Sequence, residues 1–156
     1  MPQRTVPVPK GYRTVTSQLV VRGADAAAAY YTAVFDAAVL SRIASADGIA
    51  VQQIELKIGN SILRLMDEMP DFGIWSPLAF GGTSIGLHIY RRDVDEICAR
   101  ALEHGAGLLV PLADMPWGER YMKFVDPFGH VWSVSRRIDV TRDNTRTDVA
   151  TADTFS

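Results

Sequence analysis

The sequence lacks the features that mark several large classes of protein. Cys98 is its single cysteine, so neither an intramolecular disulfide nor a four-cysteine zinc site can form. No stretch approaches the roughly 20 apolar residues that a membrane helix requires. The opening residues, MPQRTVPVPKGY, have no apolar core of the signal-peptide type. We therefore expect a protein of the reducing cytoplasm that does not enter a membrane.

An excess of charge of one sign is also missing. The 156 residues carry 16 Lys and Arg against 18 Asp and Glu, a formal net charge of −2, so a nucleic-acid partner has no electrostatic support. Apolar residues make up 47% of the chain and charged residues 22%, which excludes a chain that is disordered throughout. The sequence has no phosphate-binding loop, dinucleotide fingerprint or G-x-S-x-G motif, so we expect no nucleotide cofactor.

What the sequence does contain is one pattern of elements that occurs twice. A β-rich run is followed by a helical stretch and then by three more strand candidates, which turn residues separate. The simplest interpretation is an α+β fold of two βαβββ modules, at about 14–69 and 83–138. In the first module the segments are 15–22, the helix 24–35, 39–46, 49–58 and 61–66. In the second they are 84–90, the helix 93–104, 108–111, 120–125 and 130–135.

These modules predict a single domain over 14–138. Residues 1–13 contain three prolines and are interpreted as an extended N-terminal arm. Residues 139–156 lack apolar periodicity and are rich in Thr and Asp, which is typical of a flexible tail. At the start of the second helix, Asp93 is expected to be the N-cap, with Glu96 completing a capping box.

The strand sequences also predict which residues share a face, because side chains alternate across a strand. Each strand has one aliphatic side, which suits covering by the helix of its module. The opposite side is mixed, polar and aromatic. Such a side can meet solvent, but Val20, Met66, Tyr90 and Val131 on it favour a curled sheet that lines a cavity.

Several segments carry a family resemblance. With them the chain, over roughly residues 11–137, resembles the vicinal-oxygen-chelate superfamily of glyoxalase I, bleomycin-resistance proteins and extradiol dioxygenases, and within it the PhnB-like branch. The resemblance implies paired βαβββ modules forming a curled mixed sheet around a cavity, in a homodimer. The segments are YYTAVF at 30–35, IELKIGNS at 54–61, GGT at 81–83, LHIY at 87–90 and DPFGHVW at 126–132.

Enzymes of this superfamily hold a divalent metal with His, Gln or Glu side chains from both modules. The resemblance carries the four ligand positions onto Thr16, Arg64, Gly86 and Ser133. None of these supplies the imidazole or carboxylate donor that a divalent ion prefers. We therefore expect neither a metal nor another cofactor.

The mixed faces instead provide groups that suit an organic ligand. Their polar side chains can orient a ligand by hydrogen bonds, Arg64 offers a cation for an anionic group, and the rings offer stacking surfaces. These features favour a metal-independent small-molecule-binding protein that encloses an apolar or aromatic compound, either a drug that it sequesters or a metabolite. The ligand-binding candidates are Gln18, Gln53, Arg64, His88, Tyr90, Trp117, Tyr121 and Ser133.

A lyase, isomerase or dioxygenase of the same superfamily is the alternative. His88 would then act as a general base or bind a displaced divalent metal, with Glu55 as its partner. Glu55 has a second interpretation, a cross-strand charge ladder with Lys57 and Arg64 on a solvated rim. Cys98 is expected to be a small buried apolar residue on the packed side of the second helix.

Overall fold

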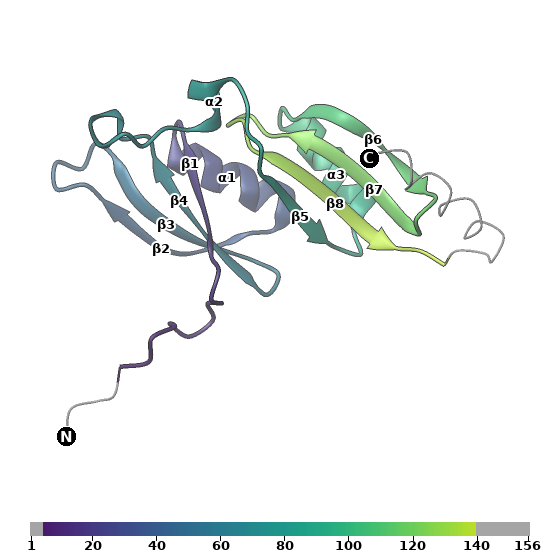
Figure 1. The fold of residues 1–156 in the computed structure, drawn as a ribbon, viewed down its shortest axis with the longest axis horizontal. Helices are drawn as coiled ribbons and strands as arrows, with labels where there is room; N and C mark the ends of the chain where they lie inside the picture. The colour runs from purple at the N-terminus through teal and green to yellow at the C-terminus, as the bar shows by residue number, and fades with distance from the viewer. Residues whose placement is uncertain (1–4, 140–156) are drawn as a thin grey trace, which may run out of the picture. The chain divides into compact units, whose positions relative to one another are not determined.

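The structure, a computed structural model, describes residues 5–139. The first four residues of the predicted arm, and all but the first residue of the predicted tail, lie outside the described residues. The chain divides into two compact units, Met1–Gly82 and Thr83–Ser156. Each unit contains one strand, one helix and three further strands in that order (Figure 1).

The first unit builds a four-stranded sheet in the order β1-β4-β3-β2. β1 pairs with β4 in parallel, and the two other pairs are antiparallel. The long connection after β4 contains the short helices η1 (Pro70–Phe72) and α2 (Pro77–Phe80). The main elements are β1 (Ser17–Val21), α1 (Ala24–Phe35), β2 (Ala38–Ala44), β3 (Val51–Ile58) and β4 (Ser61–Asp67).

The second unit repeats this topology, with the sheet order β5-β8-β7-β6 and β5 parallel to β8. Two open, mixed four-stranded sheets, each with its own helix, confirm the predicted α+β fold of paired βαβββ modules (Figure 1). The elements are β5 (Gly86–Tyr90), α3 (Val94–Glu103), β6 (Gly107–Met115), β7 (Glu119–Val125) and β8 (Val131–Arg137).

One face of each sheet packs on the helix of its own unit. Fully burying a large apolar side chain contributes about 1.5–3 kcal/mol, so these faces supply most of the driving force for folding. In β1, β3, β4, β7 and β8 the burial agrees with the predicted strand phase, since the predicted apolar side of each strand is buried. In β5 that side is half-buried, and the edge strands β2 and β6 are largely exposed. The core of the first unit includes Leu19, Tyr31, Val34, Phe35, Ile54, Leu56, Leu63 and Leu65, and that of the second Val94, Ile97, Met122, Phe124, Trp132 and Val134.

Carboxylates secure the ends of the elements. In the first unit, Asp67 accepts hydrogen bonds from the backbone N–H of Ala24 (2.7 Å) and of Val51 (2.8 Å), and so joins the starts of α1 and β3 to the end of β4. Asp93 is the N-cap residue of α3, as predicted, but the predicted capping box is wrong. The Asp93 carboxylate makes no capping bond because the guanidinium of Arg91 holds it through two contacts of 2.9 Å.

The turn between β7 and β8 is organised around Asp126, whose side chain is buried. One carboxylate oxygen accepts from the backbone N–H of Phe128 and of His130, both at 2.9 Å. The other accepts from the indole Nε1–H of Trp132, also at 2.9 Å. A buried carboxylate with three donors is a strong local anchor, since each bond involves a charged acceptor.

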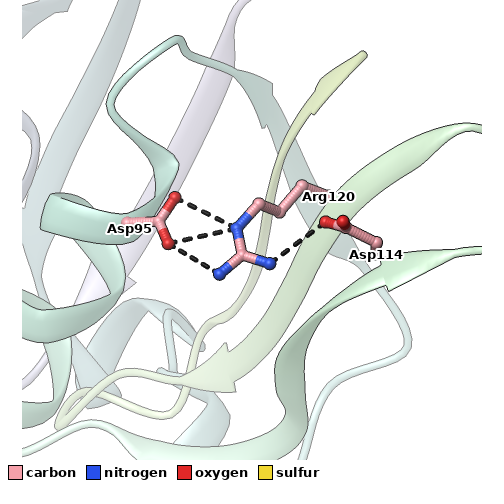
Figure 2. Close-up of polar contacts among 3 residues, drawn as sticks. All are labelled: Asp95, Asp114 and Arg120. Carbon is pink, nitrogen blue, oxygen red and sulfur yellow. Dashed lines mark hydrogen bonds and ion pairs between the residues drawn. The ribbon is translucent and has the colours of Figure 1, made fainter. Parts of the chain in front are cut away.

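An ion pair fastens each helix to its sheet. In the second unit the guanidinium of Arg120 on β7 lies 2.7 Å from Asp95 of α3 and 3.0 Å from Asp114 of β6 (Figure 2). In the first unit Arg42 of β2 contacts Asp25 of α1 at 2.8 Å. Hydrogen bonding to these guanidinium groups lowers the pKa of both helix carboxyls.

The strand bounds agree with the prediction to within two residues except in β6. That strand runs to Met115 rather than Pro111, because an edge strand tolerates a proline, and its pairing with β7 is irregular around this point. No helix within residues 5–139 is long and apolar enough to cross a membrane.

Candidate functional site

Polar and aromatic side chains gather on the sheet face of the second unit that is turned away from α3. The register pairs His88 of β5 with Ser133 of β8, and Tyr90 with Ser135. β7 places Tyr121 opposite Ser135. Because residues two apart on a strand share a face, all five side chains belong to the same surface.

His88 is held by two hydroxyl groups of β8. Its Nδ1 lies 2.6 Å from the Ser133 Oγ and its Nε2 lies 3.1 Å from the Ser135 Oγ. A neutral imidazole donates from one nitrogen and accepts at the other, and a serine hydroxyl can serve either role. Ser135 is fully buried and Ser133 is half-buried. The two hydroxyls, both on β8, therefore fix the orientation of the imidazole ring from the sheet side.

Two aromatic rings contact this imidazole, and a third ring contacts one of those two. The Tyr90 ring meets His88 edge-on with centroids 4.6 Å apart, and the Tyr121 ring stacks on His88 at 6.1 Å. Trp117 meets Tyr121 edge-on at 5.8 Å. Trp117 is 58% exposed and Tyr90 64% exposed, so both present ring surface to the outside. We call this set, with Ser133 and Ser135, the aromatic face.

Glu119 of β7 adds a carboxylate to the edge of the aromatic face. It accepts a hydrogen bond from the indole Nε1–H of Trp117 at 3.1 Å. A hydrogen bond with Glu119 also raises the pKa of Tyr90, because the carboxylate favours the neutral phenol and repels the phenolate. Glu119 therefore helps to position both exposed rings.

The corresponding face of the first unit has a different chemistry. The amide of Gln18 contacts the Met66 sulfur at 2.8 Å, and the amide of Gln53 donates to Glu55 at 3.3 Å. Arg64 lies beside Glu55 at 4.0 Å, as the charge-ladder interpretation of Glu55 expects. The polar groups of this face are thus largely engaged with one another.

Tyr12 of the predicted arm packs on this face. Its ring lies 5.3 Å from the guanidinium carbon of Arg64, a cation–π contact, and burial raises the pKa of its phenol. Gly11 approaches Ile62 so closely that a Cβ would lie 3.2 Å from the Ile62 side chain. The Nε of Arg64 is buried and has no hydrogen-bond partner among the described residues. The predicted anion-binding group is therefore partly covered by the chain itself.

The eight predicted ligand-binding residues thus divide between the units. The aromatic face brings together His88, Tyr90, Trp117, Tyr121 and Ser133, while Gln18, Gln53 and Arg64 lie on the face of the first unit. Their role in binding stays a prediction. The strand alternation correctly places Ser135 on the same face as Ser133, but the sequence did not mark it as a ligand-binding candidate. Sequence reasoning missed Glu119 and Tyr12 as members of these faces. Glu119 could have been found from alternation, since it lies two residues from Tyr121.

The four positions that the resemblance assigns to a divalent metal do not fit one. Arg64 is a cation, Gly86 has no side chain, and the Ser133 hydroxyl contacts His88. The Thr16 hydroxyl lies 3.4 Å from the Arg13 carbonyl oxygen. Within residues 5–139, no three His, Cys, Asp or Glu side chains come together as metal ligands.

Comparison with known families agrees with the fold. A sequence model of the glyoxalase/bleomycin resistance protein/dioxygenase superfamily matches residues 13–134. The chain belongs to this superfamily.

Relatives and solved structures cover most of the chain. An uncharacterised protein of Mycobacterium tuberculosis is 35% identical over 127 residues, which are 80% of this chain and 74% of the relative. TioX from Micromonospora sp. ML1 is 25% identical, with a TM-score of 0.62 over 83% of this chain and 99% of that one. A PhnB protein from Bacillus cereus, 16% identical, has a TM-score of 0.61 over 80% of this chain and 99% of its own, a likeness of fold alone.

Proposed function

We propose that this protein binds a small organic molecule with a flat aromatic or apolar part on its aromatic face, without a metal ion. The observation that supports this proposal is the set of rings of Tyr90, Tyr121 and Trp117 around an imidazole fixed by two serines. Exposed rings in a group are costly to keep on a surface and are typical of a binding site.

The parts of the aromatic face have separate roles in this proposal. The rings offer stacking surface to a flat ligand. His88 offers a directed polar group, because its orientation is set by Ser133 and Ser135. The absence of suitable donors at Thr16, Arg64, Gly86 and Ser133 supports binding that needs no metal.

Three finer assignments belong to the same proposal. The IELKIGNS and DPFGHVW segments support membership of the PhnB-like branch. Drug sequestration in the cytoplasm, as in bleomycin-resistance proteins, is one use of such a face. A homodimer is supported by the edge strands β2 and β6, which expose Leu40, Ile43 and Leu109, since apolar edge strands need protection. Light scattering on dilution tests the dimer, and a monomer at every concentration would contradict it.

Calorimetric titration with neutral aromatic probes, indole and 2-naphthol, tests the binding proposal. Stacking on an aromatic side chain is worth about 1–3 kcal/mol in nucleic-acid systems, so Trp117→Ala should weaken binding by roughly five-fold or more. Trp75→Ala is the matched control, because Trp75 is also exposed but lies in the connection after β4 of the first unit. Binding that EDTA abolishes and a divalent metal restores would contradict metal independence.

A lyase, isomerase or dioxygenase is the second candidate, and the 2.6 Å contact between His88 Nδ1 and Ser133 Oγ favours it. That distance is within the reach of a base and the hydroxyl from which it takes a proton. His88→Gln keeps a polar side chain of similar reach but removes the titratable group. A turnover lost in His88→Gln, with ligand affinity retained, would support the enzyme and displace simple binding.

A further inference from the structure

Two pairs of consecutive arginines meet at one end of the sheet of the second unit. Because β5 and β8 are parallel, their last residues lie together, and the backbone N–H of Arg91 donates to the Ser135 carbonyl at 2.9 Å. Arg92 comes next after β5, and Arg136 and Arg137 end β8. These four arginines and Tyr90 line a cavity of about 440 Å³, which we call the arginine pocket.

The arginine pocket has more positive than negative groups around it. Arg91 is held by Asp93, and Arg137 lies opposite Glu119 in the strand register. Arg92, Arg136 and Arg137 form no salt bridge with another residue of 5–139. Asp95 also interacts with Arg136 through its charge, but its carboxylate is bound by Arg120. A cationic excess therefore remains when Asp93 and Glu119 are each set against one arginine of the pocket and Asp95 against Arg120. Like charges held together repel one another, and an anion between them removes that cost.

The first unit shows that the fold does not require this arrangement. At the same end of its sheet, after β1, Arg22 lies 3.1 Å from both carboxylate oxygens of Glu68. Asp67, at the end of β4, is used by backbone N–H groups. The same topological position is thus neutralised in one unit and strongly cationic in the other.

We propose that the arginine pocket binds a tetrahedral oxyanion, such as a phosphate or phosphonate, free or as a substituent of an organic ligand. Guanidinium groups bind such oxyanions through paired N–H donors. Tyr90 belongs both to this pocket and to the aromatic face, so a ring that carries the anion would contact both. The proposal of a ligand that has both a ring and an anion rests on the proposed function. The proposal of the anion site alone does not.

Three probes separate the parts of this proposal: inorganic phosphate, phenyl phosphate and phenol. Titrations of the full chain at low ionic strength, followed by calorimetry and backbone amide shifts, should show phenyl phosphate binding at least ten-fold more tightly than phenol. The double variant Arg92→Gln/Arg137→Gln should lose at least ten-fold in affinity for both phosphates and keep its affinity for phenol. Both side chains are exposed, and circular dichroism verifies that the variant folds.

Arg22→Gln is the control, since it removes one positive charge, against two in the double variant, from the corresponding end of the first unit and should leave the affinity for all three probes unchanged. If Arg22→Gln weakens phosphate binding as much as the double variant does, phosphate is attracted by positive charge in general rather than bound at a specific site, and the proposal fails. If phenol binds but neither phosphate binds more tightly, the anion site is wrong and the proposed function stands. If phosphate binds and the double variant abolishes it while phenol never binds, the anion site holds and the aromatic ligand is wrong.

Discussion

The two units share one backbone plan and differ on the sheet face that their helices leave open. Gln18 in β1 and His88 in β5 occupy equivalent places, since α1 and α3 each begin six residues later. Across the parallel pair, Gln18 lies opposite Arg64 and His88 lies opposite Ser133. The helix-covered faces stay apolar in both units, whereas the open faces have diverged.

This difference indicates that the helix-covered apolar faces maintain the fold and the open faces are available for function. In the first unit, Glu55 and Arg64 lie beside each other and Tyr12 covers Arg64. In the second unit, exposed rings surround an oriented imidazole. The groups best suited to bind a ligand are therefore concentrated in the second unit.

The largest expected effect is on the free energy of unfolding, when the anchoring carboxylate of each unit is removed. Asp126→Ala should lower the free energy of unfolding by about 3 kcal/mol, because it leaves three N–H donors without their charged acceptor. Asp67→Ala should cost less, about 1–2 kcal/mol, because Asp67 serves two donors and is only half-buried. Urea unfolding followed by circular dichroism measures both values.

Asp71→Ala provides the surface control for this pair, since Asp71 is exposed in η1 and should change stability little. An equal or larger loss in Asp67→Ala than in Asp126→Ala would show that the first unit depends more on its anchor.

A smaller effect on the melting temperature is expected when the ion pair between helix and sheet is removed in each unit. Arg120→Ala should lower the melting temperature by more than Arg42→Ala, because Arg120 joins three elements whereas Arg42 joins two (Figure 2). Hydrogen bonds to these arginines hold the pKa of Asp95 and of Asp25 below the ordinary value of 3.8. Thermal melts of both variants at pH 7 provide the first measurement.

The pH dependence of the same variants provides the second. Because the folded pKa is the lower one, the stabilisation is present above the ordinary value and is lost as the pH falls through the folded value. The difference in melting temperature between each variant and the parent protein should therefore begin to shrink below about pH 4 and disappear below the folded pKa. A gap that persists unchanged at pH 2 would assign the loss to packing of the arginine stem rather than to its charge.

The smallest effect concerns Cys98, which occurs only in the second unit. Burial raises the pKa of this thiol to about 12, so little thiolate exists at pH 8 and a thiol reagent should not modify the native protein. Modification in intermediate urea then reports opening of α3. It should accelerate in Asp126→Ala and not in Asp67→Ala, and rapid labelling of the native protein would contradict the buried position.

Patterns within one element were sufficient to predict most of the fold. The helix 24–35 has the predicted bounds, and α3 is one residue shorter at each end than predicted. The alternation of β5 correctly separates His88 and Tyr90 from Leu87 and Ile89, because side-chain direction in a strand is a local property.

Contacts between distant segments could not be predicted in the same way. The arginine pocket joins Arg92 to Arg137, and only the parallel pairing of β5 and β8 brings these ends together. Tyr12 lies in a proline-rich stretch whose local sequence says nothing of its contact with Arg64. Asp93 has the sequence of a helix cap, but a neighbouring guanidinium competes for its carboxylate.

The parallel pairing also leaves the first strand of each unit with a single partner within residues 5–139, the last strand of that unit. The hairpins β3–β4 and β7–β8 join neighbouring segments and can close early, whereas β1 must wait for β4, and Ser17 pairs with Leu63. The entropy of loop closure grows only slowly with length, by about 0.6 kcal/mol for each doubling. The long separation of β1 from β4 along the chain therefore adds little to the free-energy cost of pairing them. During synthesis, β1 and β5 each remain an unpaired strand until their own unit is almost complete.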